Sequence, residues 1–222
     1  MKLYKLTTKN DQAYAQCQWG KNVTHAVSGE GALCGPGWIH AYTHPLLAVF
    51  LNPIHGNFDL KTAHLWECEG EVGKTDCGLK VGCTLLTTVK RIKLPKVTIE
   101  QRVKYGILCA LAVYQDDEFV GWAKNWLIEQ NRTTGAAKAA AEAAAEAAAE
   151  AAAWAARAAA EAAAWAAWAG WAAAEDAARA AWAAWAAASA AAEAAWDAAR
   201  AADFDLISLA IEATRSQDLE GG

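Results

Sequence analysis

The chain has 222 residues, and its 25 Asp and Glu residues outnumber its 20 Lys and Arg residues, which gives a formal net charge of −5. This length predicts one or two domains. The acidic balance argues against nucleic acid as a partner, because phosphate backbones are bound by clustered positive charge. No long apolar segment occurs among the first ten residues, so we expect no signal peptide, a cytoplasmic location and reduced cysteines.

Residues 1–97 are predicted to form a small α+β head domain. Alternation of polar and apolar residues, or runs of β-branched residues, predict its strands. A proline at the start of an apolar run predicts one short helix, which the Asn-Pro pair after it would end. The expected strands are Lys2–Thr7, Trp38–Tyr42, His64–Val72 and Leu79–Leu94, and the expected helix is Pro45–Leu51.

Residues 98–222 are predicted to form an all-α domain in three parts. A helical hairpin is expected over 98–131, because apolar residues recur there at helical spacing. An antiparallel bundle of helices rich in alanine and tryptophan is expected over 135–203. A C-terminal helix and tail are expected over 204–222. Together with the head domain, this predicts the α+β class for the chain.

Two helix starts in the hairpin are marked by capping residues. Thr98 and Gln101 have the three-residue spacing of a capping box, in which each side chain bonds the other residue's backbone N–H. Asp116 and Asp117 precede the second apolar run and are expected to cap its helix. These caps predict two helices in the hairpin.

Alanine dominates the tract that follows, with 46 of the 67 residues from Ala136 to Ala202 and no proline. Because alanine is the best helix former, helix is predicted throughout. A single helix would be about 100 Å long, so we expect two or three antiparallel helices instead. Thr134 is the expected N-cap of the first, and Gly170 and Ser189 are the expected turns.

Seven tryptophans recur in the tract at intervals of 3 and 11 residues. Eleven residues make almost three helical turns, so all seven fall within an arc of roughly 160°, together with most of the charged residues. The opposite face is alanine, and we expect these small faces to pack closely together. The tryptophans then form either the core of a thin bundle or a surface for a partner or ligand. They are Trp154, Trp165, Trp168, Trp171, Trp182, Trp185 and Trp196.

The tract is not expected to cross a membrane. Its longest uncharged run has 13 residues, whereas a spanning helix needs about 20. It is also acidic, with four Lys and Arg residues against eight Asp and Glu residues, which again argues against binding of a phosphate backbone.

No sequence motif predicts a catalytic residue, a metal site or a cofactor. The CxxC, HExxH, Walker and dinucleotide-binding patterns do not occur. His40 and His44 are four residues apart, but His40 falls on an expected strand, where this spacing does not bring two side chains together. Glu67, Glu69 and Glu71 alternate along one strand and are expected to form a solvated edge.

Two stretches of the head domain resemble a family of bacteriophage and bacterial proteins. Residues 34–42 (Cys-Gly-Pro-Gly-Trp-Ile-His-Ala-Tyr) and 45–49 (Pro-Leu-Leu-Ala-Val) are similar to its Gly-aromatic-His-Ala segment and its Pro-Leu segment. Residues 66–70 and 80–83 are similar to its two later strands, so the resemblance covers about residues 1–97. The later part resembles the alanine-rich helical region of such proteins and of immunity-type proteins. The resemblance implies a phage or prophage context and the host cytoplasm, but no reaction.

The order of elements in the head is also similar to that of ADP-ribosyltransferase-like folds. Such folds surround a nicotinamide with an Arg or His, a hydroxyl side chain and a Glu. The opening strand here has Lys5 instead of Arg, and His40 and Tyr42 are the nearest equivalents of the other groups. This similarity implies a degenerate head that binds a small ligand or a nucleotide near Trp38, His40 and Tyr42.

These patterns favour a non-enzymatic phage or prophage accessory protein that acts through protein–protein interaction or assembly. Two alternatives stay open: a small-ligand or nucleotide-binding protein, and a structural component that makes oligomers. The first interpretation predicts that several tryptophans of the tract are exposed. The ligand interpretation predicts a pocket lined by Trp38, His40 and the strand from Glu67 to Glu71.

Overall fold

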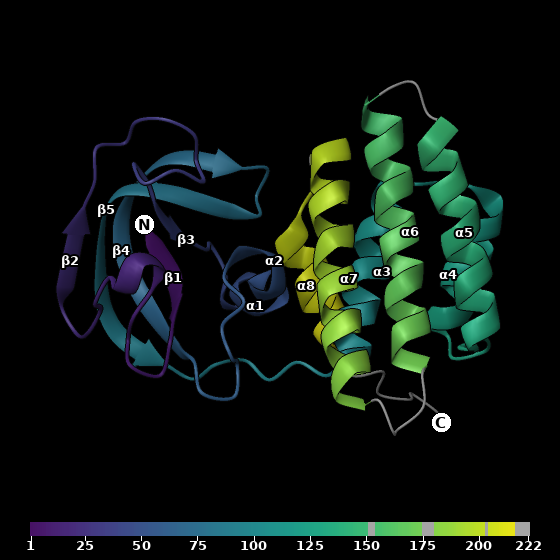
Figure 1. Ribbon diagram of the computed structural model, residues 1–222, viewed down its shortest axis with the longest axis horizontal. Helices are drawn as coiled ribbons and strands as arrows, with labels where there is room; N and C mark the ends of the chain where they lie inside the picture. The colour runs from purple at the N-terminus through teal and green to yellow at the C-terminus, as the bar shows by residue number, and fades with distance from the viewer. Residues whose placement is uncertain (151–153, 175–179, 203, 216–222) are drawn as a thin grey trace. The chain divides into compact units, whose positions relative to one another are not determined.

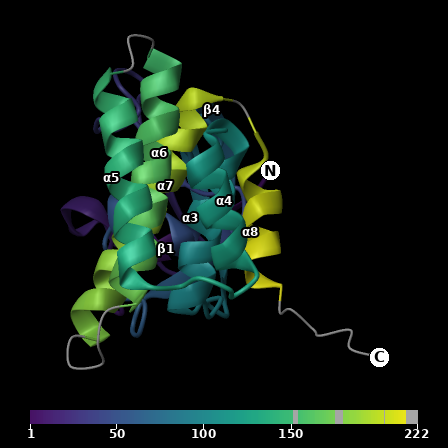
Figure 2. The same cartoon turned by 90° about the vertical axis from the view of Figure 1, so that its right-hand side faces the viewer.

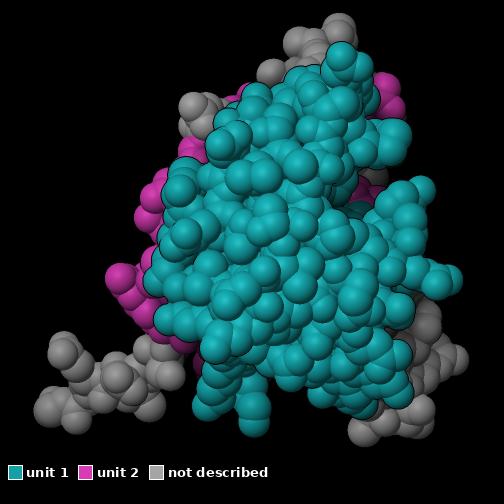
Figure 3. Space-filling model, turned by 90° about the vertical axis from the view of Figure 1, so that its left-hand side faces the viewer, with its two compact units in different colours: residues 1–96 teal, residues 97–222 magenta. Residues whose placement is uncertain are grey.

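The computed structural model describes residues 1–150, 154–174, 180–202 and 204–215. The chain divides into two compact units, Met1–Lys96 (unit 1) and Val97–Gly222 (unit 2), which are coloured separately in Figure 3. All the strands of the described chain belong to unit 1, and unit 2 is helical (Figure 1). The predicted α+β class is therefore confirmed.

Unit 1 is built on an antiparallel sheet in the order β1-β4-β5-β2, in which β3 also pairs with β5. The strands are β1 (Lys2–Thr7), β2 (Val23–Ala26), β3 (Ile39–Ala41), β4 (His64–Asp76) and β5 (Lys80–Ile92). A bridge between Tyr4 and Tyr42, with two backbone hydrogen bonds of 2.8 Å, joins β1 to the end of β3. The four strands β1, β4, β5 and β3 thus form a closed ring.

The long hairpin of β4 and β5 shapes this ring. Its turn has positive φ at both Cys77 (45°) and Gly78 (78°), as a type I′ turn requires. The pairing register shifts at three places between Glu67 and Lys74. Such bulges bend and twist a strand, which lets the hairpin curl and pair with β1, β2 and β3 together.

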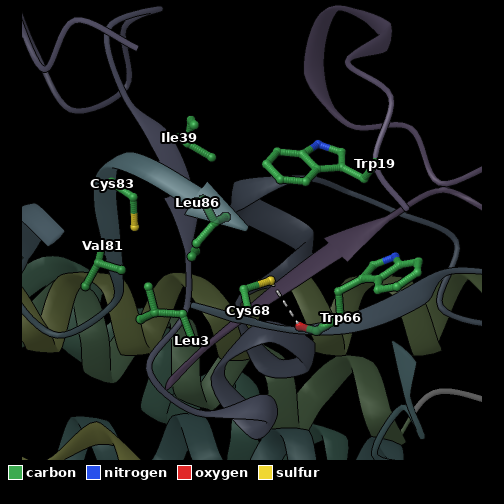
Figure 4. Packing of buried hydrophobic residues seen from close by; sticks show 9 residues of the cluster. Leu3, Trp19, Ile39, Trp66, Cys68, Val81, Cys83 and Leu86 are labelled. Atoms are coloured by element: carbon green, nitrogen blue, oxygen red, sulfur yellow. Dashed lines mark hydrogen bonds between the residues drawn. The ribbon is translucent and has the colours of Figure 1, made fainter. Parts of the chain in front are cut away.

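The side chains that point into the ring form the sheet core (Figure 4). Because side chains alternate along a strand, every second residue of β1, β3, β4 and β5 faces inward. The buried members of the core are Leu3, Trp19, Ile39, Ala41, Trp66, Cys68, Val81, Cys83 and Leu86. The Cys68 thiol donates to the Trp66 carbonyl oxygen at 3.5 Å, a bond that Figure 4 marks with a dashed line.

Three short helices complete unit 1. They are η1 (Tyr14–Gln16), a 3-10 turn, followed by α1 (Pro45–Phe50) and α2 (Asn52–His55). The His44 ring caps α1 by accepting the Leu46 N–H through Nδ1 at 3.2 Å. The predicted stop before Asn52-Pro53 is confirmed, because α1 ends at Phe50. The short helix α2, which begins at Asn52, was not predicted; proline is favourable in its first turn.

Unit 2 consists of helices whose capping residues match the sequence. They are α3 (Ile99–Val113), α4 (Asp117–Leu127), α5 (Thr134–Glu150), α6 (Trp154–Ala174), α7 (Ala180–Ala201) and α8 (Leu206–Thr214). Thr98 and Gln101 form the predicted capping box, and Asp116 caps α4. Thr133, not Thr134, caps α5: its hydroxyl accepts the Ala136 N–H at 3.3 Å. None of the described helices has both the length and the apolar composition needed to cross a membrane.

The alanine tract folds into three helices, and both expected turn positions are wrong. Gly170 lies inside α6 and Ser189 lies inside α7. One glycine costs a helix only about 1 kcal/mol relative to alanine, which the flanking alanines offset. Helices α5 and α6 pack side by side, as do α6 and α7 (Figure 2). Their connections are only a few residues long, so neighbouring helices run antiparallel.

Alanine side chains form the contacts between these helices, as expected. The fully buried members include Ala162, Ala163, Ala166, Ala167, Ala169 and Ala172 of α6 and Ala192, Ala194, Ala195 and Ala198 of α7. Helix α3 also packs against α6, α7 and α8. A Cβ atom placed on Gly106 of α3 would lie 3.0 Å from the Ala191 Cα atom of α7, so these two backbones approach very closely.

Candidate functional site

Trp38 is a packing residue in unit 1. Its ring covers two glycines of the β4–β5 hairpin: a Cβ on Gly73 would lie 2.6 Å from the ring, and one on Gly82 would lie 3.0 Å from it. Its Nε1 donates to the Gly31 carbonyl at 3.2 Å, and the Lys74 ammonium lies 5.3 Å from the ring centroid. Trp38 does not line the cavity that His40 and Tyr42 share.

His40 and Tyr42, at the end of β3, do come together at a cavity of about 340 Å³. The other lining residues are Lys5, Leu6, Ala13, Tyr14, His55, Gly56 and Phe58. They come from β1, the segment at η1, and α2 with the residues that follow it. The walls carry aromatic rings and basic groups but no carboxylate, and the strand from Glu67 to Glu71 is not among them.

The His40 ring is fixed by one hydrogen bond, between its Nε2 atom and the Leu33 carbonyl oxygen at 2.5 Å. Burial lowers the pKa of His40, and the nearby charges of Lys80 and Lys5 lower it further, whereas the hydrogen bond to Leu33 raises it. Since the net shift is downward, the imidazole is neutral at pH 7. The carbonyl oxygen acts as acceptor, so Nε2 carries the proton.

Tyr42 and His55 form a stacked pair of rings in the cavity wall, with centroids 5.8 Å apart and planes 30° apart. Burial raises the pKa of Tyr42. Burial, with the charges of Lys80 and His40, lowers the pKa of His55 to about 3. Both rings are therefore neutral near pH 7, where they can stack on a ligand and hydrogen-bond to it. Neither has a pKa near 7, as an efficient general acid or base would.

Lys5 is the unexpected member of the cavity. It lies on β1 in register with Leu3 and Thr7, the inward-facing positions, and it is only 8% exposed. Its Nζ donates to the His40 carbonyl at 2.9 Å and lies 4.9 Å from the Trp19 ring centroid. Burial lowers the pKa of Lys5. In the sequence, the feature that could have indicated this role is a lysine at a position of the alternating strand β1 whose side chain is expected to face the core.

The expectation that the three glutamates of β4 form an edge is wrong for Glu67 and Glu69, which pair with β1 on one side and with β5 on the other. Glu71 pairs with β5 alone, because it lies beyond the last β1 pair. Glu67 forms ion pairs with a lysine of each neighbour, Lys2 at 3.0 Å and Lys90 at 3.5 Å. Its hydrogen bond to Lys2 lowers the pKa of Glu67 more than burial raises it. These pairs tie three strands together on the outer face.

A second cluster in unit 1 centres on Asp11, which the motif search did not single out. Its carboxylate accepts hydrogen bonds from His64 Nδ1 at 2.7 Å, Trp66 Nε1 at 3.0 Å and Arg91 at 2.7 Å. Burial raises the pKa of Asp11, but these hydrogen bonds and the charge of Arg91 outweigh burial and lower it. Because these three partners lie on β4 or β5, the cluster fastens the loop after β1 to the sheet, and the Thr7 hydroxyl of β1 adds a bond of 3.4 Å to the same carboxylate.

Metal-ligating side chains are dispersed in the part of the chain that the structure describes. No group of three or more His, Cys, Asp or Glu residues there could hold a metal ion. His44 is occupied in capping α1, and His40 is bonded to Leu33. The six cysteines are free thiols.

Unit 2 contains a polar cavity of about 310 Å³ between α3, α4 and α8. Arg132 is one of the residues that line it, and its guanidinium carbon lies 4.3 Å from the centroid of the Trp126 ring. The same guanidinium forms ion pairs with Glu100 at 2.9 Å and Glu129 at 3.6 Å. The charges in this cavity are thus already matched by residues of the chain. It offers no unbalanced charge to a ligand.

Two tryptophans of the tract face solvent on α6. Trp165 is 41% exposed and Trp168 is 47% exposed. Trp168 packs edge to face against Trp171, with centroids 4.6 Å apart. Trp171 and Trp196 are half-buried. The predictions for Trp154, Trp182 and Trp185 fall outside the described side chains.

The charged residues of the tract divide between surface and interior. Arg157 and Glu161 form an ion pair at 2.8 Å on the exposed side of α6. Asp197 of α7 is buried, only 6% exposed, with Arg200 at 3.7 Å. Burial, with the charges of Glu161 and Glu193, raises the pKa of Asp197 to about 6. The expectation that charges share the outer surface with the tryptophans is thus wrong for Asp197.

The comparisons with known proteins identify no relative of the chain. No protein-family model matches it, and neither the curated proteins nor the solved structures contain a similar protein. The arguments for function therefore rest on the geometry of the two units.

Proposed function

We propose that the chain is a non-enzymatic interaction protein, in which unit 2 associates with a second copy of the chain through Trp165 and Trp168. The exposure of these two rings on α6 carries the proposal. The described side chains of α6 and α7 that are fully buried are alanines, whereas Trp165 and Trp168 point away from this contact. Tryptophan is enriched among the residues that dominate binding energy at protein interfaces.

The charges beside the two rings favour a second copy as the partner. Arg157 and Glu161 of the same helix pair with each other, so these two charges balance beside Trp165. In a two-fold contact the same surface is used by both copies. A neutral surface can meet itself without the repulsion that a strongly acidic surface would suffer.

The cytoplasm of a bacterial host is the location that we propose, and the phage or prophage context comes from the N-terminal resemblance alone. Two observations support the location. The six cysteines are free thiols, as is usual in a reducing compartment. In addition, none of the described helices is suited to crossing a membrane.

Sedimentation velocity of the full chain over a range of concentrations tests this function. We expect a reversible dimer whose dissociation constant rises at least tenfold when Trp165 and Trp168 are both changed to alanine. Ile128→Ala is the matched control, because Ile128 is also an exposed apolar residue of unit 2, at the end of α4. A wild-type chain that sediments as a monomer at every concentration would contradict self-association.

A further inference from the structure

Lys5 is a buried amine without an acidic partner. Among the described residues, its only hydrogen bond goes to the His40 carbonyl, and no carboxylate forms an ion pair with it. The other buried lysine of unit 1, Lys80, differs because Asp76 lies 3.8 Å from its Nζ. A buried charge is costly unless an opposite charge and hydrogen bonds compensate it.

The thiols around Lys5 do not supply the missing negative charge. Three thiols lie close to the amine: Cys68 and Cys83 belong to the same core, and Cys17 packs against it. However, burial raises the pKa of Cys68 to about 12 and that of Cys83 to about 11. Cys68 and Cys83 are therefore neutral at pH 7, and neither supplies a negative charge to the amine.

The cavity beside Lys5 has the size and the walls of a small-ligand site. Its volume of about 340 Å³ is at the lower end of the range for such sites, about 300 to 1,000 Å³. The stacked rings of Tyr42 and His55 and the ring of Phe58 offer flat apolar surfaces. With no acid in the wall, nothing repels an anion.

We propose that this cavity binds a small aromatic carboxylate, with the carboxylate at the Lys5 amine and the ring against Tyr42 and His55. The buried amine favours an anionic group and the aromatic walls favour a flat ring, so together they favour an aromatic carboxylate. The neutral rings of His40 and His55 add polar contacts but no charge. This site lies wholly in unit 1 and is independent of the association proposed for unit 2.

Calorimetric titration of the full chain with indole-3-carboxylate, indole-3-carboxamide and acetate tests the proposal. We expect the carboxylate to bind about ten- to a hundredfold more tightly than the amide, because a hydrogen bond to a charged group is lost with the amide. Acetate, which has no ring, is expected to bind more weakly than the aromatic acid. This comparison needs no variant and so does not depend on any variant folding.

Two substitutions locate the site. Lys5→Met is expected to weaken binding of indole-3-carboxylate by about ten- to a hundredfold. Lys2→Met is the control, because Lys2 lies on the same strand but pairs with Glu67 on the outer face and does not line the cavity. The proposal would be overturned by equal affinities for the acid and the amide. Unchanged affinity in a folded Lys5→Met chain, or no binding of the aromatic acid to the wild type, would overturn it as well.

Discussion

Packing of the alanine tract buries the carboxyl group of Asp197 and thereby raises its pKa. It is buried on α7, close to two other carboxylates, Glu161 and Glu193, and the charge of Arg200 offsets them in part. Its pKa is raised from 3.8 to about 6. The folded chain therefore holds a proton on Asp197 at pH values where the unfolded chain has released it, so this stabilising effect is complete below pH 3.8 and is lost as the pH rises through 6.

Asp197→Asn should remove this loss of stability at neutral pH. We expect the variant to match the wild type near pH 4 and to exceed it by about 1 to 2 kcal/mol in free energy of unfolding at pH 7.5, less than the full shift implies because water screens part of the charge. Urea unfolding at the two pH values measures this difference. Glu142→Gln, at an exposed ion pair with Lys138, is the control and should change little at either pH. A gain for Asp197→Asn that is equal at both pH values would show that the charge is not its cause.

At the candidate site, the sequence identified two of the residues that the cavity brings together, His40 and Tyr42. Their place at the end of a short aromatic strand made them visible. Trp38 was grouped with them because strand alternation would place residues 38, 40 and 42 on one face. However, Trp38 lies before β3 begins, and its ring packs on Gly73 and Gly82 instead. Lys5 was linked to His40 and Tyr42 only by the resemblance to ADP-ribosyltransferase-like folds, and His55 could not be assigned, because only the folded ring brings α2 to the end of β3.

Substitutions at two helical glycines, Gly106 and Gly121, can distinguish the effect of helix propensity from the effect of packing. Gly106 is at the close approach of α3 to α7, where an added Cβ would meet the Ala191 Cα at 3.0 Å. Gly121 is inside α4 and faces open space, with no atom within 4 Å of an added Cβ. Both positions would gain the same helix propensity from alanine, so only packing distinguishes them.

We expect Gly121→Ala to raise the free energy of unfolding by about 0.5 to 1 kcal/mol, since it removes the cost of a glycine in a helix. Gly106→Ala should instead lower it, because overpacking a tight contact typically costs about 1 to 3 kcal/mol. Thermal unfolding of the two variants beside the wild type measures both effects. If Gly106→Ala is as stabilising as Gly121→Ala, then α3 and α7 do not approach closely.

Helices and strands that are determined by neighbouring residues in the sequence were predictable, and those that depend on contacts with distant residues were not. The capping box at Thr98 and the proline at Pro45 fix helix starts through neighbouring residues, and both predictions are confirmed. β2 (Val23–Ala26) was missed, because four residues are too few to show an alternating pattern and its pairing with β5 stabilises it. The turns of the tract were misplaced because propensity differs so little along an alanine sequence.

For the whole molecule, the two proposals assign separate roles to the two units. Unit 2 would associate through α6, and unit 1 would hold an aromatic anion at Lys5. We expect Lys5→Met to leave the dissociation constant of the dimer unchanged, because Lys5 is buried inside unit 1. Sedimentation velocity of this variant checks the point, and a shift as large as that of the double tryptophan variant would mean that the two roles are coupled.

The most direct test of the central claim is the molar mass of the wild-type chain by light scattering, with iodide quenching of tryptophan fluorescence on the same samples. The monomer has a mass of 23.5 kDa. We predict that the mass rises to twice this value with concentration, and that quenching falls in parallel as Trp165 and Trp168 become covered. A mass that stays at the monomer value, with quenching unchanged, would contradict the account.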